Sequence, residues 1–194
     1  MNYYPDWLGR NLVTDEFPWG YATNTSLSAF LTAYTLHDSY WLGWYLLPNQ
    51  EAVAVIRWDT WHTNGRIPFP GSTVAQWPLP LIRVERLYQM HMNHATGAKG
   101  DEYIPILANT IDSAESTPLL ITEREAMLEY VLRQPDRPEP LSTYLLDSPV
   151  YQTMFQSIGQ GQTLAIHGGE TRLLCLNRTG DVLPIPGLPL LSPQ

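Results

Sequence analysis

The sequence predicts one α+β domain with a mostly antiparallel sheet and a few packed helices. Short segments rich in β-branched and aromatic residues are separated by turn residues along much of the chain. Other segments repeat apolar residues at helical spacing. The 194 residues are enough for one full hydrophobic core, and no break in composition marks a second domain.

The N-terminal part predicts an irregular arm, a helix and a hairpin. Residues 1–21 mix proline, glycine and aromatic residues without a period, which favours an irregular arm packed by its rings. Ser26 is a predicted helix N-cap, and residues 27–34 carry apolar side chains at helical spacing. Residues 40–47 and 52–58 are rich in β-formers and flank a turn. Because neither segment alternates, we expect the hairpin near the middle of a sheet.

The next part predicts a long loop and two strands. Residues 62–78 contain three prolines and two glycines, which is typical of a loop. Residues 81–87 alternate apolar and charged side chains and predict a strand with one solvated face. Residues 103–108 predict an edge strand, because Pro105 interrupts them.

A helix with an acidic outer face is predicted after residue 121. Thr122 and Glu125 have the spacing of a capping box, and Pro135 ends the helix. Glu125 and Glu129 are expected to point outward. The inward face is expected to consist of Met127, Leu128, Val131 and Leu132.

The last part predicts a second helix, a hairpin and a tail. Ser148 begins this helix and Gly159 ends it. Gly168 and Gly169 separate two apolar runs and predict a two-residue hairpin, because glycine tolerates positive φ. Residues 182–189 predict an extended proline-rich tail.

Acidic residues are concentrated in the second half of the chain. Residues 101–194 hold twelve acidic and five basic side chains, and so carry −7 of the net charge of −8. Such a surface repels nucleic-acid phosphates and anionic membranes and attracts a basic protein. We therefore predict a basic protein partner that contacts an acidic loop at Asp112 and Glu115 and the helix with Glu125 and Glu129. Solubility is the alternative role of these acids.

Tryptophans are the second group of candidate binding residues. Five of them lie between positions 41 and 77. Each can fill a core or anchor a partner. We expect Trp41, Trp44 and Trp58 in the core. Trp61 and Trp77 flank the proline-rich loop and are predicted to be exposed and to contact the partner.

No catalytic, cofactor or metal site is predicted. Residues 37–39 (His-Asp-Ser) have the residue types of a catalytic triad, but neighbouring side chains of a strand point to opposite faces. We expect them to set the turn before a strand. His91 and His94 offer two metal ligands, whereas zinc needs at least three from the protein. The glycine-rich turns lack phosphate-binding spacing. Cys175 lies in an apolar run and is expected in the core.

Localisation is expected to be cytoplasmic. The chain begins without a basic region followed by an apolar one. No apolar run approaches the ~20 residues that cross a bilayer.

Four segments resemble small bacterial immunity-type and uncharacterised proteins associated with polymorphic toxins. They are LHDSYWLG (36–43), VIRWD (55–59), QWP (76–78) and LIRV (81–84). The resemblance covers about residues 26–90. It implies a cytoplasmic, non-enzymatic protein that binds a toxin domain and occludes its active site. It implies no particular functional residues.

Three kinds of function remain open at this point. The first is a binding protein that neutralises a basic effector or toxin. The second is a small enzyme in which His37, Asp38, His91 or His94 work with acidic residues as general acid and base. The third is a structural or assembly subunit.

Overall fold

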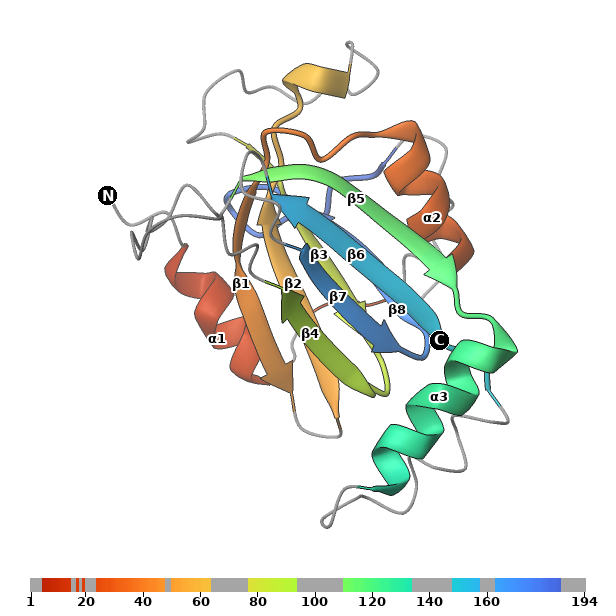
Figure 1. Ribbon diagram of the computed structural model, residues 1–194. Coiled ribbons are helices and arrows are strands. Elements are labelled where there is room, and N and C mark those ends of the chain that lie inside the picture. Colours follow the sequence, from red (N-terminus) through yellow and green to blue (C-terminus); the bar gives the residue numbers. More distant parts are fainter. Residues whose placement is uncertain are drawn as a thin grey trace, which may run out of the picture.

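Two antiparallel sheets and three α-helices make up the part of the chain that the computed structural model describes (Figure 1). These residues are 5–14, 17, 19, 24–47, 50–63, 77–93, 110–133, 148–157 and 163–185. The helices are α1 (Asp6–Thr14), α2 (Asn24–Ala33), α3 (Ile121–Leu132) and the short 3-10 helix η1 (Trp61–Thr63). The strands are β1 (Tyr40–Leu47), β2 (Glu51–Arg57), β3 (Leu79–Val84), β4 (Gln89–Asn93), β5 (Ile111–Pro118), β6 (Tyr151–Ser157), β7 (Thr163–Gly168) and β8 (Thr171–Leu176). The predicted α+β class is confirmed.

Within the described residues, two connections between the sheets are seen. The first sheet has the order β1-β2-β3-β8, and the second has the order β4-β7-β6-β5. A bent two-stranded ribbon joins the two sheets. β3 leads into β4 in one strand of the ribbon, and β7 leads into β8 in the other, with β3 paired to β8 and β4 paired to β7. At the bend, the Glu85 N–H donates to the Glu170 carbonyl at 2.8 Å, and the Gly169 N–H donates to the Glu85 carbonyl at 2.7 Å. A second link is the bridge between Tyr40 and Thr110, before β5.

The glycine pair between β7 and β8 lies in this bend. The predicted hairpin at Gly168 and Gly169 is wrong, because the two strands belong to different sheets. Neither glycine has a positive φ. A Cβ at Gly168 would lie 2.1 Å from Val84 Cγ1, and one at Gly169 would lie 2.7 Å from Arg86 Nε. Glycine is therefore needed for the close approach of two chain segments.

The larger hydrophobic core joins the facing sides of the two sheets with α2. It includes Ile56 and Leu173 from the first sheet, Phe155 and Ile166 from the second, and Phe30 from α2. A second core lies on the opposite face of the first sheet, where α1 packs. The first sheet is thus buried on both faces, which explains the continuous apolar run in β2.

Three element predictions near the first sheet are wrong. Residues 6–14 form α1 instead of an irregular arm, because Leu8 and Leu12 lie four residues apart and pack together on the sheet. β3 has no solvated face, since α1 covers the side that carries Leu79 and Leu81. β1 is an edge strand of its sheet, and only β2 of the predicted hairpin lies between two strands.

Residues 151–157 form strand β6, where a helix was predicted from Ser148 to Gly159. β6 pairs with β5 on one side and with β7 on the other. Thr153 and Phe155 are both buried, at the spacing of two that a strand requires. Pairing on both sides outweighs the local helical pattern.

Other predictions are confirmed within the described residues. β1 and β2 form the expected hairpin, and α2 matches the predicted helix but begins at Asn24. Cys175 is buried, and Val182 pairs with Leu176 at the start of the extended tail. The predicted strand at 103–108, most of the predicted loop and residues 186–189 lie outside the described residues.

Candidate functional site

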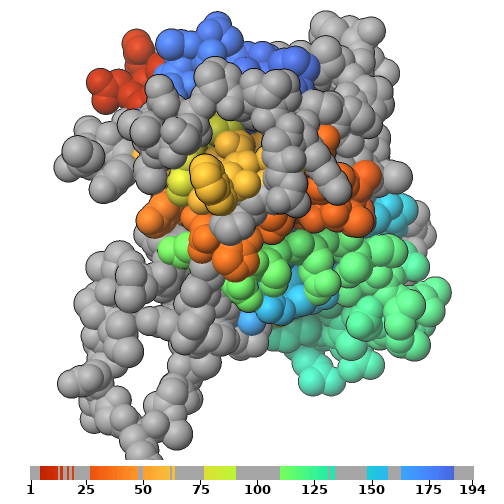
Figure 2. All heavy atoms as spheres, turned by 90° about the horizontal axis from the view of Figure 1, so that it is seen from above, coloured from red at the N-terminus to blue at the C-terminus, as the bar shows by residue number. Residues whose placement is uncertain are grey.

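β5 and α3 form an exposed acidic surface, seen as the adjoining green regions of Figure 2. Asp112 and Glu115 lie on β5, which is an edge strand of the second sheet. Glu125 and Glu129 lie on α3, which follows β5 directly in the chain. All four side chains are exposed. Residues 110–133 hold five acidic and two basic side chains, which give a net charge of −3.

The structure corrects the expected loop at Asp112 and Glu115. Both residues belong to β5, which pairs with β6 along its length. Their carboxylates also have a structural role there, because charges on an edge strand oppose pairing with a strand of another molecule. The outward position of Glu125 and Glu129 on a helix is confirmed.

α3 begins with a different cap from the one predicted. The Leu120 N–H donates to Glu123 Oε2 at 2.7 Å, which is the return bond of a capping box two residues earlier than expected. Glu125 therefore has no capping role and stays on the solvent side. Arg124 fixes the same end of the helix to the chain before β6, because its Nη1 donates to the Ser148 carbonyl at 3.1 Å.

A small apolar cluster, apart from the two main cores, holds α3 against the sheets. Met127 and Val150 are its buried members, and Leu128 packs against them together with Tyr88 and Leu119. This confirms Met127 and Leu128 as inward-facing residues.

The rest of the predicted inward face of α3 is not confirmed. Leu132 is 43 % exposed, so its assignment to the inward face is wrong. The Val131 side chain lies outside the described residues. In Figure 1 the helix extends away from the two sheets, and most of its described side chains are exposed.

Large apolar side chains are exposed between the carboxylates of the acidic surface. Eight large apolar or aromatic residues in the described part of the chain are exposed, and four of them lie on α3 or next to it. They are Leu120, Ile121, Tyr130 and Leu132. Isolated exposed apolar residues are ordinary, whereas a local group of them marks an interaction surface. The sequence contained one signal of this group, since Ile121 and Leu132 are eleven residues apart and share a helix side with Glu125.

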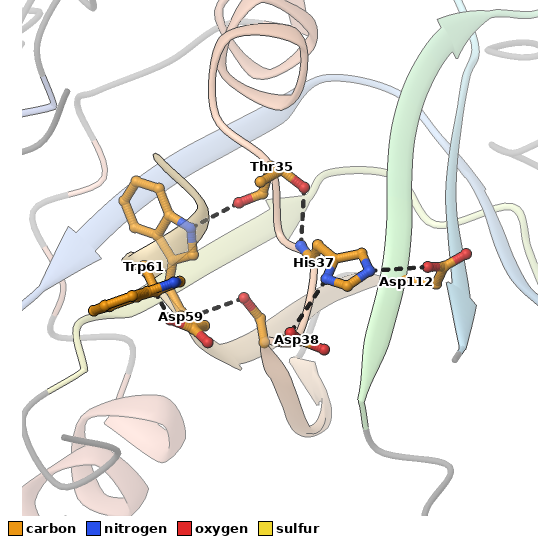
Figure 3. A network of polar contacts seen from close by, with 8 residues as sticks. Thr35, His37, Asp38, Asp59, Trp61 and Asp112 are labelled. Atoms are coloured by element: carbon orange, nitrogen blue, oxygen red, sulfur yellow. Dashed lines mark hydrogen bonds and ion pairs between the residues drawn. The ribbon is translucent and has the colours of Figure 1, made fainter. Parts of the chain in front are cut away.

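His37 connects the end of the acidic surface to the first sheet (Figure 3). Its Nδ1 lies 3.3 Å from Asp38 Oδ2, and its Nε2 lies 3.4 Å from Asp112 Oδ1. His37 and Asp38 lie in the turn that was expected before the strand, where Asp38 has a φ of 62°. Their side chains therefore come together, unlike those of neighbouring positions in a strand. A register shift between Ile111 and Ser113 shows that Asp112 is the extra residue of a β-bulge. Such a bulge changes the direction of a side chain.

Trp61 belongs to a second group of polar contacts in the same region (Figure 3). The Trp61 backbone N–H donates to Asp59 Oδ1 at 2.8 Å, and the Asp59 backbone N–H donates to Ser39 Oγ at 3.0 Å. Ser39 and Asp59 are buried, while Trp61 is 77 % exposed. These bonds hold the backbone that carries the indole, and the predicted exposure of Trp61 is confirmed.

Trp77 does not share this exposure. It is buried, and its ring packs against Tyr40 with the ring centroids 5.9 Å apart. The prediction of an exposed Trp77 is wrong, since the residue lies beside the first sheet at the start of β3. Trp58 is fully buried as expected, and Trp41 and Trp44 pack against the same core while remaining partly exposed.

His91, another candidate reactive residue, lies on a strand far from His37. His91 lies on β4, at the edge of the second sheet opposite to β5, and His94 lies outside the described residues. Three strand spacings separate β4 from β5, which is about 14 Å. Within the described ranges, no group of three His, Cys, Asp or Glu side chains is arranged to hold a metal ion. Burial raises the pKa of the Cys175 thiol far above its usual range.

Comparison with known protein families, with curated proteins and with solved structures gives no match for this chain. None of the helices in the described part of the chain is long and apolar enough to cross a membrane.

Proposed function

We propose that the protein is a cytoplasmic, non-enzymatic binding protein that neutralises a basic effector or toxin by covering its active site. The acidic surface of β5 and α3 is the proposed contact surface. The observation that carries this proposal is the group of exposed apolar side chains among carboxylates on α3. A surface that only keeps a protein soluble needs the carboxylates but not these apolar residues.

The two kinds of side chain have different roles in this proposal. The carboxylates increase the rate of encounter with a basic protein and disfavour acidic ones. Covering Ile121 and Leu120, which are 63 % and 68 % exposed, removes apolar area from water and contributes about 1–2 kcal/mol each. Trp61 adds an aromatic anchor beyond the end of β5.

The proposal is tested by comparing what two forms of the full chain retain from a lysate of the source organism. One form is wild type, and the other is Glu125→Lys/Glu129→Lys. We expect a basic protein that only the wild type retains and that salt elutes. Expression of that protein alone is expected to stop growth, and co-expression with the wild-type chain to restore it. Equal retention by both forms would show that α3 is not the contact surface.

A second candidate function is acid–base catalysis at His37. It is supported by the two carboxylates that lie against the two ring nitrogens of this half-exposed histidine. A test is hydrolysis of chromogenic ester and phosphate substrates by the wild type and by His37→Asn. Activity that disappears with the substitution supports this function, whereas activity that persists or never occurs argues against it.

A further inference from the structure

One side of α3 has the residue pattern of a helix-pairing seam. Ile121, Glu125, Leu128 and Leu132 follow one another at spacings of four, three and four residues. These spacings place the four side chains in one line along the helix, as at the d, a, d and a positions of two heptads. We call these four residues the α3 seam. It is about 16 Å long at 1.5 Å per residue.

Three of the four side chains of the α3 seam are exposed in the described part of the structure. Ile121 is 63 % exposed and Leu132 is 43 % exposed, while Glu125 is also exposed. Leu128 is the inner member and rests on the cluster around Met127 and Val150. Leu128 is therefore held by packing inside the protein, while Ile121 and Leu132 at the two ends of the seam are exposed to solvent.

Glu125 determines which helix fits the α3 seam. It occupies the second position of the line, between two apolar residues, and Glu129 stands beside it on the next turn. A charge at a core position of a helix pair is stable only opposite a charge of the other sign. We propose that the α3 seam receives an amphipathic helix of the partner, with leucine-type residues along its line and a lysine or arginine opposite Glu125.

This inference rests on the proposed function and specifies the partner's contact element. Charge complementarity favours a basic helix, since residues 110–133 carry a net charge of −3. A second copy of the chain is a poor occupant, because in a parallel pair Glu125 would face its own copy. A partner strand added to β5 would instead meet the exposed Asp112 and Glu115 on that edge.

The test uses the full chain and two synthetic helical peptides of about three heptads. Both peptides carry leucines along one line and lysines on the outer face, and they differ only opposite Glu125, where one has lysine and the other has glutamate. Binding is measured by fluorescence anisotropy. We expect the wild-type chain to bind the lysine peptide about tenfold more tightly than the glutamate peptide. Glu125→Lys is expected to reverse this preference.

Control variants distinguish specific binding of the peptide at the α3 seam from nonspecific electrostatic binding to the acidic surface. Ile121→Ser is expected to weaken binding of the lysine peptide several-fold, whereas Leu46→Ser, at an exposed apolar position on β1 of the first sheet, leaves it unchanged. Glu115→Lys changes the charge of β5 and is expected to have a much smaller effect than Glu125→Lys. Circular dichroism of each variant confirms that it is folded.

Three results would overturn the inference. These are absence of peptide binding to the wild type, an equal effect of Glu115→Lys and Glu125→Lys, and failure of Glu125→Lys to prefer the glutamate peptide. If any of these occurs while Glu125→Lys/Glu129→Lys still loses the captured basic protein, the acidic surface is the contact but its occupant is not a helix. If the peptides bind as expected but Glu125→Lys/Glu129→Lys retains the same proteins as the wild type, the proposed function is wrong. The inference that the α3 seam binds a basic helix would then still hold.

Discussion

At the scale of single residues, the fold depends on positions where two distant segments touch. Gly168 lies against Val84 at the bend between the sheets, and the two residues are far apart in sequence. His37 touches Asp112 where the other edges of the sheets meet. Both contacts join the first sheet to the second, so each side chain has to suit a neighbour that local sequence does not show.

Gly168→Ala is expected to destabilise the protein by about 1–3 kcal/mol, because the new methyl group overlaps Val84 in a packed core. Gly9→Ala is the matched control. Nothing lies within 4 Å of a Cβ at Gly9, which is inside α1, so alanine there is expected to stabilise by about 0.5–1 kcal/mol. Urea unfolding measures both values. A Gly168→Ala protein that is as stable as the wild type, or more stable, would contradict the described bend.

Cys175 is expected to be unreactive in the folded protein. Burial raises the pKa of its thiol, so the reactive thiolate is absent at pH 8, and the sulfur is covered by the core. Labelling with a thiol-specific disulfide reagent should therefore occur only in denaturant, following the unfolding transition. Rapid stoichiometric labelling without denaturant would show that the core around β8 is open.

At the scale of elements, bulges and caps decide which way side chains point. In β1 a register shift between Trp41 and Gly43 makes Leu42 the extra residue, and as a result Trp41 and Trp44 both face the core between the sheets. In β5 the bulge at Asp112 turns its carboxylate toward His37. In α3 the cap begins the helix at Ile121 and leaves Glu125 on the solvent side.

The cap of α3 can be distinguished from the one that the sequence predicts. Glu123→Ala is expected to destabilise α3 by about 0.5–1 kcal/mol, since the carboxylate no longer accepts the Leu120 N–H. Glu125→Ala is expected to change stability by only a few tenths of a kcal/mol. Amide hydrogen exchange in the first turn of α3 measures the local effect. A larger loss for Glu125→Ala would instead support the predicted capping box.

At the scale of the whole molecule, the sequence predicts the class of fold and several elements, but not how the strands divide between two sheets. The β1–β2 hairpin, α2 and most of α3 follow from local patterns. The sequence predicts a helix over residues 151–157 because Val150, Met154 and Ile158 repeat at helical spacing, and only pairing with β5 and β7 makes these residues a strand. The bend at Gly168 depends on Val84, which no local pattern reveals.

The same limit applies to the candidate site. The sequence predicts Glu125 and Glu129 on the outer face of a helix, because the spacing of apolar and charged residues that predicts their exposure lies within that one helix. The contact between Asp112 and His37 requires a bulge, a turn with positive φ at Asp38 and contact between the sheets, so the sequence does not predict it. The exposure of Ile121 depends on how far α3 extends beyond the sheets.

The central claim is that the acidic surface on α3 binds a basic protein. The most direct test is the association rate constant of the captured partner, measured by stopped flow over a range of ionic strength. Glu125→Gln/Glu129→Gln removes two negative charges from α3, and Asn11→Lys/Thr14→Lys adds two positive charges to α1, which packs on the far face of the first sheet. Both pairs change the net charge by the same amount.

The account predicts that the α3 variant associates about tenfold more slowly at low ionic strength and depends less on salt than the wild type. The α1 variant is predicted to stay close to the wild type in both respects. Equal rates and equal salt dependence for the α3 variant and the wild type would contradict the claim that α3 carries the binding surface.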